Sequence, residues 1–536
     1  PSLPLNTRPP LPAMSSVLAP FSRGALRLSR AAYGPAVAGV LSSAAPRRSV
    51  SSPPALWKSV HGIFDFETPM TEKMPGIPKA TAMPAIPFSP AQITTLPSGL
   101  RVASSDAAGR VASVSLFVDA GSRYESSPAL SGTSHLLEKL AFTSTATRSK
   151  FRMLRDIEAS GLAVSAAASR ECMAYSVEGM RGQVGAMAEI VVEAATRPAL
   201  MNYAGGVVET DFARAELRAD AAELGEAAAE LMKDPNMVLM ESVHAAAYGG
   251  STLGLPLPAV KGKIEKIEPA TVADYLSALY TADRMVVSGV NVDHDELVAA
   301  VTASAADVPR SSSLGFPKAT YVGGEVRVPA AEVGAGSHVA LAFEGVAWED
   351  PDVIPVCVLN SLLGGGGSFS AGGPGKGMYT KLYTEVLNRH GWVQNVAAFN
   401  CIYSDSGLFG ITASAGPGEL AQLADLVVEQ ANNMAKGLSA EQVSRAKNMT
   451  ASALVMHLES RSLMSEDIGR QVLSSGKHIP ADELVQKIQA VSVKDLQRVA
   501  SRMLASKPSL VLYGDLINTP TFQHVESSVV SKKLSQ

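Results

Sequence analysis

The sequence has few cysteines, no excess of basic charge and no long apolar run, and each feature argues against a class of protein. Its three cysteines are scattered over 536 residues, so neither a disulfide framework nor a cysteine-based metal site is indicated. The formal net charge of −4 gives no broad positive field, which argues against nucleic acid as a partner. No apolar run reaches the ~18 residues that a membrane-spanning helix needs. Hydrophobic residues make up 46% of the chain and charged residues 18%, which is typical of a globular protein with large cores.

Acidic residues are absent from residues 1–64, whereas arginine, serine and alanine are frequent there. This composition is typical of an organelle transit peptide, and a disordered basic tail is the alternative. Met14 fits an internal start, and residues 47–49, Arg-Arg-Ser, are a candidate cleavage site. The proline-rich residues 65–92 predict a linker that leads into the folded part of the chain.

Two stretches of the sequence resemble each other, which indicates a duplicated domain. Residues 264–275 read IEKIEPATVADY, and residues 485–496 read VQKIQAVSVKDL. We predict that Thr271 and Ser492 cap the helices that follow, and each helix leads to an apolar strand that ends in glycine. A repeat of roughly 220 residues is too long for a solenoid unit, so it indicates two related domains.

The predicted fold class is α+β, with two duplicated domains that each form a largely antiparallel sheet packed by helices. Strands are predicted at Val114–Val118 and Val339–Phe343, and helices mix with strands without a strict βαβ rhythm. A stretch rich in serine, glycine and proline predicts the linker between the halves. The predicted divisions are an N-terminal domain over 93–304, the linker over 305–324, a C-terminal domain over 325–520 and a tail over 521–536.

One helix of the first half carries a metal-site pattern that lacks a ligand. His135, Glu138 and Lys139 have the spacing of the inverted zinc-peptidase motif H-x-x-E-H, but lysine replaces the second histidine. In that motif two histidines on one helical face bind zinc, and the glutamate between them activates water. Glu216, on a later helix, is placed to supply a third ligand.

Lys139 makes a catalytic zinc ion in this chain improbable on chemical grounds. A protonated ammonium group has no lone pair to donate, and its charge repels a cation. The motif is therefore predicted to be degenerate, with no catalytic residue and no metal in this chain. His135 is then expected to be an ordinary hydrogen-bonded helix histidine, and Glu216 part of a solvated acidic face.

The densest glycine run in the sequence is residues 364–377, GGGGSFSAGGPGKG. Glycine loses more backbone entropy on ordering than any other residue, so such a run inside a domain needs a reason. A phosphate-binding loop is excluded, because Ser370 stands where the pattern needs its first glycine and Gly377 where it needs Ser or Thr. A passive flexible linker and a lid that hydrogen-bonds an extended peptide both remain open.

If the run contacts a substrate, Phe369 is suited to the apolar face of a peptide, whereas Lys376 would not attract a basic one. The predicted substrate-contacting residues are Gly364, Gly365, Gly366, Gly367, Ser368, Phe369, Gly372, Gly373, Gly375, Lys376 and Gly377.

The chain resembles the pitrilysin-type family of zinc peptidases, and within it the subunits of the mitochondrial processing peptidase. The likeness runs from about residue 93 to residue 514, and residues 135–142, 280–286 and above all 362–383 carry it. The resemblance implies a non-catalytic subunit of the alpha type. Such a subunit recognises presequences through its glycine-rich loop, while a beta subunit with a complete zinc motif cleaves them.

The same resemblance implies the cofactor, the partners and the location. The chain would hold no cofactor itself, and zinc would be bound by the beta partner, which is similar to core protein 1 of respiratory complex III. The expected partners are that beta subunit, precursor presequence peptides and, in some lineages, other complex III subunits. The expected location is the mitochondrial matrix, either free or attached to the matrix side of the inner membrane. The alternative function is a structural core-2 subunit of the ubiquinol-cytochrome c reductase complex without processing activity.

Overall fold

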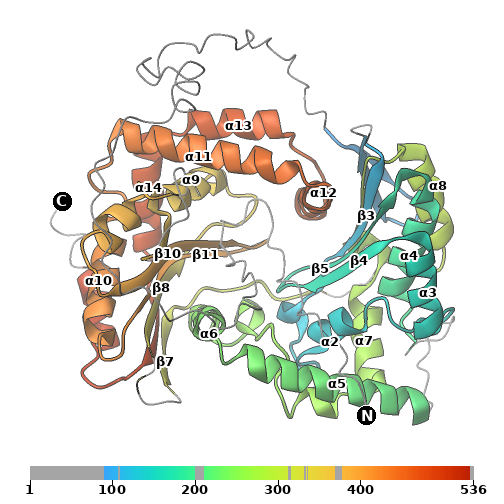
Figure 1. Ribbon diagram of the computed structural model, residues 1–536, viewed down its shortest axis with the longest axis horizontal. Helices are drawn as coiled ribbons and strands as arrows, with labels where there is room; N and C mark the ends of the chain where they lie inside the picture. The colour runs from blue at the N-terminus through green and yellow to red at the C-terminus, as the bar shows by residue number, and fades with distance from the viewer. Residues whose placement is uncertain are drawn as a thin grey trace, which may run out of the picture. The chain divides into compact units, whose positions relative to one another are not determined.

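Two six-stranded sheets, one from each half of the chain, organise the fold (Figure 1). The computed structural model describes residues 90–106, 109–199, 211–311, 315–330, 334, 336–368 and 377–530. The predicted targeting segment therefore lies outside the described residues, as does most of the proline-rich linker.

The first sheet has the strand order β1-β2-β6-β3-β5-β4. Its strands β2 and β6 run parallel, and every other neighbouring pair is antiparallel. The bounds are β1 Gln92–Thr95, β2 Arg101–Ser105, β3 Val111–Val118, β4 Ala163–Ala168, β5 Met173–Met180 and β6 Met285–Val290.

The second sheet repeats this plan in the order β7-β12-β8-β11-β10-β9, again with a single parallel pair, β7 and β12. Its strands are β7 Gly324–Pro329, β8 Ser337–Glu344, β9 Gly365–Gly367, β10 Val393–Ile402, β11 Gly407–Ala415 and β12 Ser509–Gly514. The order β2-β6-β3-β5-β4 in the first sheet corresponds to the order β7-β12-β8-β11-β10 in the second, with the parallel pair in the same place. The predicted duplication and the largely antiparallel α+β class are therefore confirmed. Strands β1 and β9 are additions at opposite edges of the shared plan.

Each sheet has one face covered by helices of its own half and the other face covered by a helix of the other half. In the first sheet, α4 (Val184–Thr196) packs on β3 and β5, whereas α12 (Arg461–Ser475) packs on the opposite face of β3 and β6. In the second sheet, α10 (Leu420–Asn433) covers β8 and β11, and α6 (Pro235–Tyr248) lies against the opposite face. The two halves are thus joined by exchanged helices, which Figure 1 shows as α6 and α12 between the sheets.

The other α-helices are α2 Thr133–Leu140, α3 Lys150–Ser160, α5 Asp211–Leu231, α7 Pro269–Leu279, α8 His294–Ser304, α9 Val353–Leu363, α11 Ala440–Leu458, α13 Ala481–Ala490, α14 Val493–Leu504 and α15 Phe522–Val530. The 3₁₀ helices are η1 Ser122–Tyr124, η2 Arg181–Gln183, η3 Thr252–Gly254, η4 Ile264–Lys266 and η5 Ala282–Arg284, and η6 Tyr383–Leu387 is a π-helix. None of the described helices combines the length and apolarity needed to cross a membrane.

The two predicted helix caps have different outcomes. Ser492 caps α14 in a capping box with Asp495, so this prediction is confirmed. The prediction for Thr271 is wrong, because α7 already begins at Pro269 and its N-cap is Glu268. Proline has no N–H to lose and a fixed φ suited to the first turn, so the earlier start is favoured.

Successive residues of β3 point to opposite faces of the first sheet. Val114 and Leu116 point into the core beneath α4, whereas Ser115 and Phe117 point toward α12. The Ser465 hydroxyl of α12 donates to Ser115 Oγ at 3.0 Å. This face of the strand therefore carries both a polar contact and an aromatic ring against the exchanged helix.

A buried arginine makes a second connection between the halves. The Arg123 guanidinium binds Asp405 through both terminal nitrogens, Nη1 to Oδ1 at 3.1 Å and Nη2 to Oδ2 at 2.7 Å, and it also contacts Glu171. The Arg123 side chain is only 5% exposed, and Glu171 additionally accepts a hydrogen bond from the Ser404 backbone at 2.9 Å. Because the pairing is bidentate and shielded, it fixes the turn between β10 and β11 against the first half.

We predict that Gly469→Ala destabilises the chain. A Cβ atom at Gly469 of α12 would overlap the Phe117 ring, which is 1% exposed, so the exchanged helix must shift off its sheet. Overpacking of this kind costs ~1–3 kcal/mol, which a lower midpoint of urea unfolding would report. The control is Gly185→Ala in α4, where no atom lies within 4 Å of the added carbon. Equal midpoints for Gly469→Ala and the unchanged chain would contradict the close packing of α12 against Phe117.

Candidate functional site

The helix with the degenerate motif, α2, is fixed at its N-terminus by a buried carboxylate. Glu125 accepts hydrogen bonds from the Gly132 backbone at 2.6 Å, and from the Ser134 backbone and hydroxyl at 2.8 and 2.6 Å. Burial raises the pKa of Glu125 to about 7, and these three hydrogen bonds oppose the increase. The first turn of a helix leaves backbone N–H groups without partners, and Glu125 pairs two of them, those of Gly132 and Ser134. This contact holds α2 in one orientation.

His135, the first residue of the motif, is engaged by the protein itself. Its Nδ1 accepts a hydrogen bond from the Ala259 backbone N–H at 3.0 Å, so the ring proton of the neutral form lies on Nε2. Burial lowers the pKa of His135, which favours that neutral form. The imidazole therefore ties α2 to the segment that follows α6.

Glu138 and Lys139 point to different partners. Glu138 Oε2 accepts a hydrogen bond from the Ala168 backbone N–H at 3.0 Å, at the end of edge strand β4, and burial raises the pKa of this carboxyl. Lys139 Nζ lies 2.7 Å from Glu223 Oε1 on α5, with side-chain exposures of 37% and 68%. The residue in the position of the second ligand is thus a cation held in an ion pair.

The three motif residues, His135, Glu138 and Lys139, do not fit a zinc site. Lys139 offers no lone pair while it is paired with Glu223, and His135 Nδ1 is already in use. No cluster of three or more His, Cys, Asp or Glu residues suited to a metal ion occurs in the part of the chain that the structure describes. Glu216 belongs to α5, but its side chain lies outside the described residues, so its role stays a prediction.

The glycine-rich run begins as a strand, which the sequence did not predict. Gly364 ends α9, where its N–H donates to Asn360 O at 2.8 Å. The next three glycines form β9, an edge strand paired with β10 in the antiparallel register Gly365↔Ala397 to Gly367↔Asn395. The run therefore does not start as a loose tether.

Gly365 shows why glycine is required in this strand. Its φ of +117° is a conformation that other residues rarely adopt, and a Cβ atom there would overlap the Val396 carbonyl oxygen. Ser368 continues the pairing, because its N–H donates to Gln394 O at 2.7 Å. The predicted contact residues Phe369, Gly372, Gly373, Gly375 and Lys376 lie outside the described residues.

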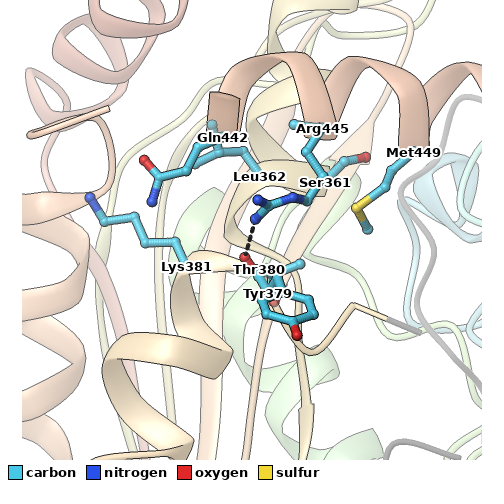
Figure 2. A pocket seen from close by; sticks show the side chains of 9 residues that line it. Ser361, Leu362, Tyr379, Thr380, Lys381, Gln442, Arg445 and Met449 are labelled. Atoms are coloured by element: carbon cyan, nitrogen blue, oxygen red, sulfur yellow. Dashed lines mark hydrogen bonds between the residues drawn. The ribbon is translucent and has the colours of Figure 1, made fainter. Parts of the chain in front are cut away.

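The glycine-rich run ends beside a small pocket between α9, α11 and residues 379–381 (Figure 2). The Arg445 guanidinium of α11 lies 5.4 Å from the centre of the Tyr379 ring and donates to the Tyr379 carbonyl at 3.3 Å. Tyr379 is 72% exposed, and its neighbour Met378 is 40% exposed. An aromatic and an apolar side chain thus stand at the surface directly after the glycines.

Sequence reasoning missed Glu125, Thr380 and Arg445. Glu125 precedes its helix by several residues, and Arg445 comes from a distant helix, so no local pattern marks either one. Thr380 lies three residues after the last glycine of the run, and only the folded structure shows that its hydroxyl contacts both Gly365 and Gly377.

Family models match both halves of the chain. The model described as "Insulinase (Peptidase family M16)" matches residues 101–259, and "Peptidase M16 inactive domain" matches residues 266–450. The first match lies within the first half, and the second runs from the end of the first half, including β6 and α8, into the second half.

Curated relatives cover most of the chain. The mitochondrial-processing peptidase subunit alpha of Solanum tuberosum is 38% identical over 446 residues, which are 82% of this chain and 85% of that protein. The subunit alpha of Homo sapiens is 34% identical over 90% of this chain and 93% of its own length. A chain in a solved structure of complex III2 from Candida albicans superposes with a TM-score of 0.67 at 21% identity, covering 82% of this chain and 99% of that one, and this likeness concerns the fold.

Matches to both family models, together with identities above 30% over most of the chain, thus show that this chain belongs to peptidase family M16, in the group of the mitochondrial-processing peptidase alpha subunits.

Proposed function

We propose that this chain is the non-catalytic, presequence-recognising subunit of a zinc endopeptidase in the mitochondrial matrix. A beta subunit with a complete zinc motif is its partner and makes the cut. The chain itself holds no cofactor, and its substrates are the targeting presequences of precursor proteins.

The Lys139–Glu223 ion pair is the observation that carries this proposal. It places a cation 2.7 Å from a carboxylate where a peptidase of this type needs a zinc ligand. Without zinc, Glu138 has no metal-bound water to activate, and its carboxylate instead accepts the Ala168 N–H. A chain with this arrangement contributes something other than bond cleavage.

Strand β9 supports a role in holding an extended peptide. It is the last strand of the second sheet, and an edge strand can pair with an added peptide through backbone groups that have no partner in its own sheet. The Gly365 N–H is not one of these groups, because it donates to Thr380 Oγ1 at 3.3 Å. The exposed Tyr379 and Met378 beyond the run offer apolar surface to an amphipathic presequence. In this proposal the glycine-rich run and its flanks form the presequence-contacting surface.

A second candidate function is that of a structural core subunit of complex III. The superposition on a complex III2 chain from Candida albicans, which covers 99% of that chain, favours it. The two functions are compatible, because one subunit pair could process precursors while it is built into the complex. Native gel fractionation separates them, since a core subunit co-migrates with cytochromes and a matrix heterodimer does not.

We predict that presequence cleavage requires both subunits and that zinc resides in the beta subunit. The purified chain alone should neither cleave a precursor nor bind zinc stoichiometrically, because Lys139 removes a ligand. The reconstituted pair should cleave, lose activity on chelation and regain it when zinc is added back. Metal analysis of the separated subunits identifies which one holds the ion. Cleavage together with stoichiometric zinc in this chain alone would refute the proposal.

We also predict that Gly365→Ala weakens presequence binding by the reconstituted pair. The new Cβ would collide with the Val396 carbonyl and push β9 off β10. A backbone displacement of this size costs ~1–3 kcal/mol, so KM should rise about tenfold while kcat changes little. Gly391→Ala is the matched control, because it adds the same carbon where no atom lies within 4 Å. If both variants kept the unaltered KM, the glycine strand would have no part in binding.

A further inference from the structure

We propose that one exposed face of α11 is a docking surface for a basic, amphipathic segment of the presequence, and that Glu459 pairs with one of its cationic side chains. The inference rests on the proposed function and adds to it a surface and a residue that selects for charge. This surface, the α11 face, consists of Tyr379, Arg445, Met449, Met456 and Glu459.

Helical spacing places three residues of α11 on one side of the helix. Arg445, Met449 and Met456 are separated by four and seven residues, so they form one row along ~16 Å of the helix axis. A different side of α11 packs against α9, where Thr450 donates to Ser361 at 2.8 Å. Met456 remains 60% exposed. The row is therefore distinct from the side of α11 that enters the core.

An exposed aromatic ring next to this row is held in place before any ligand binds. The Arg445 guanidinium lies 5.4 Å from the centre of the Tyr379 ring, donates to the Tyr379 carbonyl at 3.3 Å and binds Glu441 Oε1 at 2.7 Å. In Figure 2 the Arg445 and Met449 side chains leave α11 on the side where Tyr379 lies. Tyr379 is 72% exposed. A fixed tyrosine loses little entropy on binding, and tyrosine is a residue type that often dominates interface energies.

Methionine supplies most of the remaining apolar surface. Met449 and Met456 lie in the row, and Met378, 40% exposed, precedes Tyr379. Unbranched methionine side chains adapt to partners of different shape, which branched side chains do less well. A subunit that accepts many precursors must bind apolar side chains in varied arrangements. A methionine-rich face suits an amphipathic segment of this kind, which lays its apolar side on a groove or helix surface.

Glu459 gives the face its charge. It follows Met456 by three residues, and its backbone keeps helical angles at the C-terminal end of α11. A negative charge there opposes the helix dipole, and Glu459 forms no ion pair with a described residue that would offset this cost. Arg445 is already paired with Glu441, and Arg461 begins α12, which Figure 1 shows end-on beside α11. A carboxylate that costs stability locally is explained if it binds a cation of the ligand.

The apolar part of the face is tested by Met456→Gln in the heterodimer. The affinity of a fluorescently labelled, amphipathic presequence peptide is measured with zinc removed, so that no peptide is cut. Glutamine keeps the length of the side chain and removes its apolar character, so Kd should rise roughly three- to tenfold. Met180→Gln on the first sheet is the matched control, because that methionine is 57% exposed, and it should leave Kd unchanged.

The charge is tested by Glu459→Gln with the same peptide. Kd should rise roughly two- to fivefold, while the midpoint of urea unfolding should stay equal or rise, because a charge that opposes the helix dipole is removed. A peptide whose arginines are replaced by glutamine should bind this variant and the unaltered pair equally. Glu429→Gln, at an exposed position of α10, is the control.

Unchanged affinity in either Met456→Gln or Glu459→Gln would overturn the inference and leave the proposed function intact, as long as the unaltered pair binds the peptide. A pair that binds no presequence would refute the proposed function and the inference with it. Analytical ultracentrifugation measures the association of Met456→Gln with the beta subunit. Weaker association at unchanged peptide affinity would also overturn the inference, because the α11 face would then be a subunit interface.

Discussion

Each sheet of this protein has two faces to cover, and helices of one half cover only one of them. The second face of each sheet is covered by a helix from the other half, α12 on the first sheet and α6 on the second. Because a bare apolar sheet face is unstable in water, neither half can separate from the other without exposing a core. The bidentate Arg123–Asp405 pair adds a buried polar contact across the same division. The degenerate motif and β9, the start of the glycine-rich run, therefore belong to one unit.

That unit uses the motif helix for structure. His135 and Glu138 each accept a backbone N–H, from Ala259 and Ala168, and Lys139 is paired with Glu223. All three side chains that would form or serve a zinc site in a catalytic relative thus hold α2 against its neighbours. The loss of one ligand leaves the other two motif residues as structural contacts, which is consistent with a subunit that is kept for recognition.

The sequence predicted those features that depend on local patterns. Alternating or apolar runs located the strands around Val114 and Val339, the repeat indicated two domains, and Lys139 marked the motif as degenerate. It could not predict the exchanged helices, because α6 and α12 have ordinary compositions and their partners lie far away in the chain. Strand β9 was also missed, since glycine disfavours strands and only the pairing with β10 explains Gly365–Gly367. Thr380 also required the three-dimensional structure, because its hydroxyl contacts Gly365 and Gly377, near opposite ends of the run.

In the proposed function, this chain holds the presequence and its partner cuts it. The most direct measurement is the equilibrium affinity of a fluorescently labelled presequence peptide for this chain alone, for the beta subunit alone and for the pair, with zinc removed so that no peptide is cut. This division of roles predicts saturable binding to the pair that is much tighter than binding to the beta subunit alone, and measurable binding to this chain without its partner. Equal affinity of the pair and the beta subunit alone, with no binding to this chain, would contradict it.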